Sequence, residues 1–207
     1  MIFYFARHGE SVANTGNIIS NRDIDHPLTP AGRQQAERLA ERLADAGLSV
    51  VYSSPVPRAL ETATIVSRSL DIPLQTADGL REFDCGILEG RSGPLAWMRF
   101  SFILHQWFAR KRVEKRFRGG ESFLDVRQRF TAFVDAVVER NSGADNRVLC
   151  ITHAGALHIG LTGLLNQIPI EEIIAWSIPY TAVIKTEHSN GGFVLTGRED
   201  LNHPLAQ

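Results

Sequence analysis

Three separated segments of the chain each place a basic side chain beside small residues: Arg7-His8-Gly9, Ser53-Ser54-Pro55 followed by Arg58, and His153-Ala154-Gly155. Guanidinium groups bind the spread negative charge of a phosphoryl group through forked hydrogen bonds, and a neutral imidazole can attack phosphorus. If the fold brings the three segments together, two arginines and two histidines would meet at one site. The chemistry that such a site favours is phosphoryl transfer.

The elements that must position these residues are buried strands. Apolar runs rich in β-branched or aromatic residues predict strands at 2–6, 50–53 and 148–152, and a further strand is expected at 72–76. Each basic segment directly follows one of the first three strands. Because ligands bind beyond the carboxyl ends of the strands in an open α/β sheet, we expect these segments to converge on one rim.

Helical patterns separate the predicted strands. Strands that alternate with helices indicate a mainly parallel sheet, because parallel strands need crossover connections. We therefore predict an α/β fold, a three-layer sandwich with helices on both faces of the sheet. The first predicted helix begins at the Thr29-Pro30 cap and ends at Gly47, and the second runs from Pro57 to Leu70. The third starts at Ser122 with a capping box to Asp125, and the fourth spans 156–165. Strands at 182–186 and 193–196 are predicted to form a closing hairpin, and the tail from Arg198 is predicted to be irregular.

Residues 93–120 interrupt this alternation with an aromatic and basic stretch, which we call the cap segment. It is predicted to form a small helical insert over the edge of the sheet. A solvated basic helix face with a packed apolar side is one interpretation, and recognition of a second anionic group on a substrate is another. Single-stranded nucleic acid is a third, which the overall charge disfavours. Ser20, Asn21, Arg110 and Arg112 are the candidates for substrate recognition.

Composition limits the remaining classes. With 207 residues the chain is long enough for one domain, and its net charge of −1 offers no field that would gather nucleic acid or an anionic membrane. Cys85 and Cys150 are predicted to be buried free thiols. The first apolar run is too short for a signal peptide, and no run reaches transmembrane length, so a cytoplasmic location is expected. We see no Walker A loop, Asp-rich magnesium site or His-x-x-x-His zinc pair; no metal or other cofactor is expected, and protein cations would neutralise the phosphate.

Several motifs, in order along the chain, resemble the histidine phosphatase superfamily, the phosphoglycerate mutase-like group. The first is Arg7-His8-Gly9-Glu10-Ser11, which looks like the signature of that family. Any single motif would be weak evidence, but six in the family's order span most of the chain. The others are 28–32 (LTPAG), 53–63 (SSPVPRALETA), 80–90 (LREFDCGILEG), 119–122 (GGES) and 152–155 (THAG).

This resemblance implies a role for each matching residue. His8 would be the nucleophile that becomes a phosphohistidine, and Glu82 the proton donor, with a pKa that would have to be raised. Arg7, Arg58 and a protonated His153 would bind the transferred phosphoryl group. Asn14 and Ala154 complete the expected phosphate-binding set, and the fold would be phosphoglycerate mutase-like.

The chain also departs from the family pattern. Ala13 and Leu88 stand where family members often carry an aromatic residue, and Ala154 stands where glycine is usual. These positions concern the walls of the pocket more than its reacting groups. The expected activity is therefore hydrolysis of a small phosphorylated metabolite, with a cofactor-dependent phosphoglycerate mutase and a catalytically inactive phospho-ligand-binding module as alternatives. The assembly state, a homodimer included, stays open.

Overall fold

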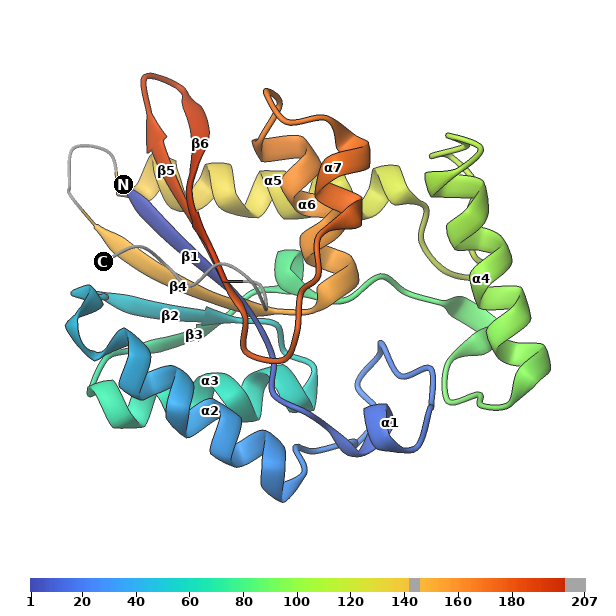
Figure 1. The fold of residues 1–207 in the computed structure, drawn as a ribbon, viewed down its shortest axis with the longest axis horizontal. Helices are drawn as coiled ribbons and strands as arrows, with labels where there is room; N and C mark the ends of the chain where they lie inside the picture. The colour runs from blue at the N-terminus through green and yellow to red at the C-terminus, as the bar shows by residue number, and fades with distance from the viewer. Residues whose placement is uncertain (142–145, 200–207) are drawn as a thin grey trace.

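The computed structural model describes residues 1–141 and 146–199 and has a six-stranded sheet with helices on both faces (Figure 1). The spatial order is β3-β2-β4-β1-β5-β6. Strands β1 to β4 pair in parallel, and β5 and β6 are antiparallel to their neighbours. The predicted α/β sandwich is confirmed. The strands are β1 (Ile2–Arg7), β2 (Val50–Ser53), β3 (Leu74–Thr76), β4 (Arg147–Thr152), β5 (Val183–Ser189) and β6 (Gly192–Arg198).

The helices begin at the capping signals that the sequence carries. Thr29 Oγ accepts a hydrogen bond from the Gly32 N–H at 3.0 Å, and Ser122 and Asp125 form a reciprocal capping box. The longer helices are α2 (Pro30–Leu43), α3 (Pro57–Leu70), α4 (Pro94–Phe108), α5 (Phe123–Arg140) and α6 (Ala154–Leu164). The shorter ones are α1 (Val12–Thr15), α7 (Ile170–Ala175) and the 3₁₀ turns η1 (Ala44–Ala46), η2 (Asp78–Leu80) and η3 (Gly86–Leu88).

The two faces of the sheet bury separate cores because neighbouring residues of a strand point to opposite sides. Phe3 and Phe5 of β1 pack with α5 and α6, whereas Tyr4 and Ala6 pack with α2 and α3. In Figure 1, α5 and α6 lie above the sheet and α2 and α3 below it. A third cluster, centred on the buried Trp107, joins the cap segment to α5 and α6.

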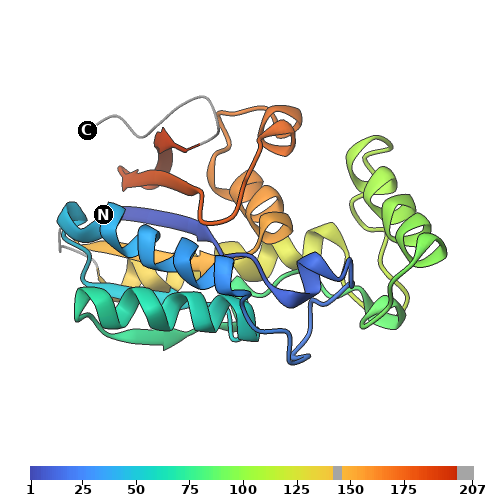
Figure 2. The same cartoon turned by 60° about the horizontal axis from the view of Figure 1, so that its bottom comes forward.

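The carboxyl ends of β1, β2 and β4 meet at one edge of the sheet. Arg7 lies opposite Thr152, and Ser53 lies opposite Ile151. The residues that follow these strands are therefore neighbours in space. Helix α4 of the cap segment lies beyond this edge in both views (Figures 1 and 2).

Several boundaries differ from the sequence predictions. The predicted helical insert consists of one helix, because α4 ends at Phe108 and Lys111 adopts a positive φ of 53°. The hairpin strands are longer than predicted because Asn190-Gly191, both at positive φ, close them with a tight turn. Arg198 ends β6 and is not irregular, and the predicted tail from 200 onward lies outside the described residues. Cys85 and Cys150 are buried free thiols, as predicted.

Across residues 1–141 and 146–199, no helix combines the length and the apolar character that crossing a bilayer requires.

Candidate active site

The residues that follow β1, β2 and β4 line one cavity of about 110 Å³. We call it the His8 pocket. Arg7 and His8 come from the end of β1, Arg58 from the first turn of α3, and Ala154 from the start of α6. The predicted convergence on one rim is therefore confirmed. Its other lining residues are Ala13, Asn14, Ile18, Ile19, Ser20, Asn21, Glu82, Phe83, Trp97 and Phe100.

His8 is buried and its two ring nitrogens have different partners. Nδ1 lies 2.6 Å from the Gly9 carbonyl oxygen, so the proton is assigned to Nδ1. Nε2 accepts a hydrogen bond from Arg58 Nε at 2.9 Å. Burial, and then the charges of Arg58 and Arg7, hold the pKa of His8 well below its ordinary 6.5. The ring is therefore neutral at pH 7, with a lone pair on Nε2.

Arg58 connects both histidines through a guanidinium that is buried with them. It is 4% exposed, and besides His8 it donates to the Ser20 carbonyl oxygen at 2.6 Å and to His153 Nδ1 at 3.1 Å. Burial lowers the pKa of Arg58 to about 10, so the group stays cationic at neutral pH. The Arg58 side chain therefore places a buried positive charge between the two histidine rings.

His153 is also neutral in this structure; the protonated ring is expected for the phosphate-bound pocket and stays a prediction. Its Nδ1 is the acceptor for Arg58, and its Nε2 lies 2.9 Å from Ser54 Oγ. Burial, and then the Arg58 charge, hold the pKa of His153 well below 6.5. The ring cannot carry a proton on Nδ1 while it accepts a hydrogen bond there.

The Arg7 guanidinium is held through a terminal nitrogen, whereas its Nε lacks a hydrogen-bond partner among the described residues. One terminal nitrogen donates to the Ile178 carbonyl oxygen at 2.9 Å, and the guanidinium lies 4.2 Å from the centre of the Tyr180 ring. Its Nε is buried and has no hydrogen-bond partner among the described residues. A buried donor without a partner is costly, so this N–H is suited to an anionic oxygen.

Glu82 faces the pocket from the loop after η2 and is anchored by two backbone amides. Its oxygens accept from the Phe83 N–H at 3.1 Å and from the Gly155 N–H at 3.0 Å. Burial raises the pKa of Glu82, and this outweighs the amides and the Arg58 charge, which act in the opposite direction. The direction of this shift is the one that a proton donor requires.

The remaining predicted residues fall into two groups. Asn14, Ser20 and Asn21 line the pocket: Asn14 Oδ1 accepts from the Ser11 N–H at 3.1 Å, and Asn21 donates to the Phe83 carbonyl oxygen at 2.8 Å. Arg110 and Arg112, in contrast, are exposed and do not line it. In the same segment, Trp107 and Phe117 are buried.

Four residues in or beside the pocket were not predicted from the sequence as site residues. Trp97 and Phe100 line the pocket from α4, and their spacing of three residues on a predicted helix could have indicated a shared face. Tyr180 contacts Arg7 from an irregular loop, and no periodic pattern marks it. Ser54, the partner of His153, was expected only as a small residue of the segment that precedes Arg58.

Metal-ligating side chains do not gather elsewhere: within the part of the chain that the structure describes, no three His, Cys, Asp or Glu residues are grouped to hold a metal ion.

Comparisons with known proteins agree with this geometry. The model of the Histidine phosphatase superfamily (branch 1) matches residues 3–201. A Yersinia enterocolitica protein named Probable phosphoglycerate mutase GpmB is 30% identical over 174 residues, 82% of this chain and 77% of that protein. The structure of Bacillus stearothermophilus YhfR is 31% identical, with a TM-score of 0.81 and 94% of each chain covered.

A further solved structure supports the fold alone. Phosphoserine phosphatase from Entamoeba histolytica, in complex with 3-phosphoglyceric acid, is 22% identical with a TM-score of 0.81 over 98% of each chain. The fold is thus phosphoglycerate mutase-like. His153 does not itself line the pocket but is hydrogen-bonded to Arg58, which does. Because the family model covers almost the whole sequence, this chain belongs to branch 1 of the histidine phosphatase superfamily.

Proposed function

We propose that this protein is a phosphatase that hydrolyses a small phosphomonoester through a phosphohistidine on His8. The observation that carries the proposal is the arrangement around His8 Nε2. This nitrogen is unprotonated, lies 2.9 Å from Arg58 Nε, and shares a cavity with the unpartnered Nε of Arg7. A nucleophile and two cations for the phosphoryl oxygens are therefore held in place before substrate arrives.

The reaction would proceed in two balanced steps. His8 Nε2 attacks phosphorus, the ester P–O bond breaks, and Glu82 gives its proton to the departing oxygen. Glu82, now a carboxylate, then accepts a proton from a water molecule that attacks the phosphohistidine. The P–N bond breaks, phosphate leaves, and both residues return to their starting states.

Protein cations would supply the charge stabilisation. Arg7 and Arg58 would donate to the equatorial oxygens of the transferred group, and Asn14 and Ala154 line the same cavity. We expect the arrival of a phosphate dianion to raise the pKa of His153, because an opposite charge nearby favours the protonated ring. His153 would then become a third donor during the reaction.

The aromatic wall of the pocket, formed by Phe83, Trp97 and Phe100, supports hydrolysis over mutase activity. Apart from Arg7 and Arg58, the described lining residues carry no cationic side chain, and the wall contains Phe83, Trp97 and Phe100. A phosphoglycerate carries a carboxylate in addition to its phosphate and would need a partner there. An uncharged or aromatic alcohol fits this wall better, because apolar contact area would be buried on binding.

A phosphoglycerate mutase is the second candidate, because GpmB-named relatives reach 30% identity over most of the chain. A mutase shares the phosphohistidine but must return the phosphoryl group to a bound acceptor. A third candidate is a catalytically inactive module that holds phosphorylated ligands. The phosphatase would release phosphate, the mutase would release an isomer of its substrate, and the inactive module would form no product.

One experiment separates them. The purified protein is incubated, with chelator, with a panel of alkyl and aryl phosphates, and separately with 3-phosphoglycerate plus 2,3-bisphosphoglycerate. Free phosphate that disappears in His8→Ala but persists in His105→Ala, whose exposed ring lies outside the pocket, would support the proposal. Isomerisation without phosphate release would indicate a mutase, and binding without either product would indicate the inactive module.

A further inference from the structure

The loop that carries Glu82 is held by the guanidinium of Arg129, on α5. One terminal nitrogen, Nη1, donates to the carbonyl oxygens of Gly79 at 2.9 Å and Arg81 at 2.8 Å. The other, Nη2, donates to the Glu82 carbonyl oxygen at 3.1 Å. A single side chain therefore fixes three of the four carbonyl groups between residues 79 and 82.

Glu121 completes the hydrogen bonds of this guanidinium. Its carboxylate accepts from Arg129 Nε at 2.8 Å and from Arg129 Nη2 at 3.0 Å. The five N–H groups of an arginine thus all have an oxygen partner here. Because the guanidinium is planar and its donors point in fixed directions, this arrangement holds the loop in one geometry, which a lysine could not do.

The same stretch of backbone is fixed at its remaining carbonyl and packs closely on α5. The Leu80 carbonyl oxygen accepts from Thr152 Oγ1, at the end of β4, at 2.6 Å. A Cβ on Gly79 would lie 2.9 Å from the Arg129 carbonyl oxygen and would also overlap Phe133, so glycine is needed for this approach. Every carbonyl from 79 to 82 therefore has a donor from α5 or β4.

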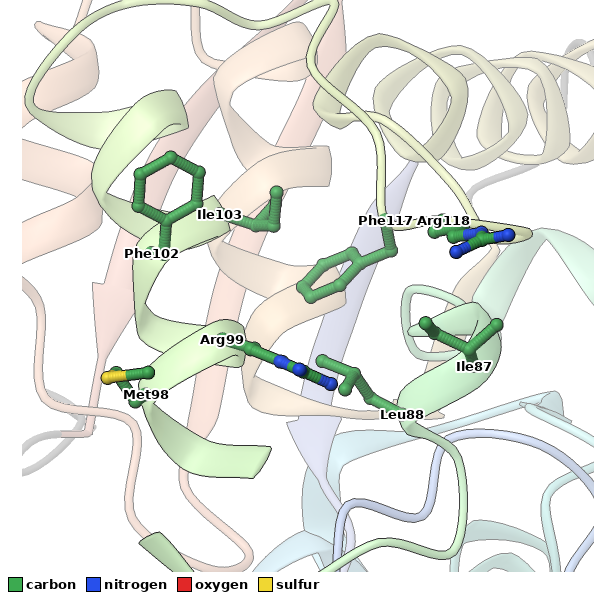
Figure 3. A pocket seen from close by; sticks show the side chains of 8 residues that line it. All are labelled: Ile87, Leu88, Met98, Arg99, Phe102, Ile103, Phe117 and Arg118. Atoms are coloured by element: carbon green, nitrogen blue, oxygen red, sulfur yellow. The ribbon is translucent and has the colours of Figure 1, made fainter. Parts of the chain in front are cut away.

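The chain that follows Glu82 borders an unfilled volume. It leads into η3, where Ile87 and Leu88 line an apolar cavity of about 360 Å³ with side chains of α4 on its other side (Figure 3). This cavity shares no lining residue with the His8 pocket. For residues 79–82, the contacts that fix the backbone are thus those with α5 and β4.

We propose that Arg129 is the positioning residue of the proton donor. By fixing the carbonyls of residues 79, 81 and 82, it holds the Glu82 carboxyl where it accepts from the Gly155 N–H and faces the leaving oxygen. Arg129 does not line the His8 pocket and touches no substrate. This role rests on the proposed function, because Glu82 is the acid of that reaction.

The test compares two leaving groups in Arg129→Lys, which keeps the charge but cannot form the forked hydrogen bonds. We expect kcat for an alkyl phosphate to fall about 10- to 100-fold, because a displaced carboxyl cannot protonate the alkoxide. For p-nitrophenyl phosphate, whose leaving group needs no proton, kcat should fall much less. Glu121→Gln, which keeps the shape of the partner, should cause a smaller loss with the same preference. Arg140→Lys, exposed near the end of α5, should leave kcat for both substrates unchanged.

A double variant shows whether Arg129 acts through Glu82. If it does, adding Arg129→Lys to Glu82→Gln should cause no further loss of kcat on the alkyl phosphate, because the acid is already absent. Losses that multiply would overturn the proposal, as would normal alkyl phosphate turnover in Arg129→Lys. A Glu82→Gln variant that loses equally on both substrates would instead overturn the acid role in the proposed function.

Hydrogen exchange tests the positioning without a substrate. The Gly155 N–H lies in the first turn of α6, where amides have no partner within their own helix, and it donates to Glu82 Oε2 at 3.0 Å. Its exchange, measured by NMR relative to the Cys150 amide in the middle of the sheet, should be faster in Arg129→Lys and unchanged in Arg140→Lys. Unchanged exchange in Arg129→Lys would overturn the proposal. Faster exchange in a protein that releases no phosphate would support the positioning of Glu82 and overturn the proposed hydrolysis.

Discussion

Arg58 Nε donates to His8 Nε2 over 2.9 Å, so the cation that would bind the phosphoryl group also holds the lone pair of the proposed nucleophile. This hydrogen bond keeps the imidazole neutral and aimed at the cavity. It must give way as phosphate binds, because the guanidinium donors then turn to phosphoryl oxygens. Substrate binding and release of the nucleophile are thereby coupled through one side chain.

Arg58→Gln should lower kcat/KM for a phosphomonoester by about 100-fold or more, because one preorganised charge is lost from the transition state. It should also raise the pKa of His8 towards 6.5, since the Arg58 charge is one of the causes of its depression. Steady-state kinetics and an NMR titration of ¹⁵N-labelled histidines measure the two effects. Arg68→Gln, exposed on the same helix, is the control; an unchanged His8 titration in Arg58→Gln would contradict the argument.

Glu82 should determine the alkaline side of the pH profile. A proton donor works only below its pKa, and burial places the pKa of Glu82 above 4.5, so kcat should fall as pH rises through that raised value. Glu82→Gln should lack this limb. It should also slow alkyl phosphates far more than p-nitrophenyl phosphate, whose leaving group needs no proton. Glu37→Gln, at an exposed position of α2, is the control. Equal losses of kcat on both substrates in Glu82→Gln would exclude the role of Glu82 as the acid.

Gly155 should matter because it leaves room for Glu82. A Cβ at this position would lie 2.2 Å from Phe83 Cε1 and 2.7 Å from Glu82 Oε1. Gly155→Ala should therefore displace the carboxyl and lower kcat by about 10- to 100-fold, with a smaller effect on KM. Gly192→Ala, where a Cβ meets nothing within 4 Å, is the matched control. Full activity in Gly155→Ala would show that the carboxyl does not need this position.

Local signals explain what the sequence could predict. Thr29, Pro57 and Ser122 start helices through their own backbone and side-chain preferences, and strand periodicity is equally local. The ends of the parallel strands then had to meet, which brought His8, Arg58 and His153 together. These inferences needed no knowledge of side-chain packing.

The features that the sequence could not predict depend on tertiary contacts. The neutral state of His153 follows from burial beside Arg58, ninety-five residues away, which no local pattern reports. Tyr180 reaches Arg7 from a loop with no regular structure. Arg110 is exposed because it lies just after α4, which ends at Phe108, and no local pattern marks that end.

The aromatic wall should determine substrate preference. Because the aromatic rings of Trp97 and Phe100 line the pocket, Trp97→Ala should lower kcat/KM for 1-naphthyl phosphate about tenfold more than for glycerol phosphate. The comparison of two substrates on one variant separates lost contact from general damage. Phe102→Ala, also on α4 but outside this pocket, should leave kcat/KM for both substrates unchanged. A uniform loss on both substrates would mean that the wall is only structural.

The two buried histidines should make the fold sensitive to acid. The pKa of each lies well below 6.5 in the folded chain, so below pH 6.5 the unfolded chain binds protons that the folded chain does not. Stability contributed above pH 6.5 is therefore lost as pH falls, by about 1.4 kcal/mol per pH unit for each histidine. The free energy of unfolding, measured with urea at pH 7.0, 6.0 and 5.0, should fall with this slope. In the double variant His8→Asn/His153→Asn the slope should be smaller by up to the contribution of two histidines. His105→Asn, exposed on α4, should keep the full slope; an equally steep slope in the double variant would mean that other groups cause the acid sensitivity.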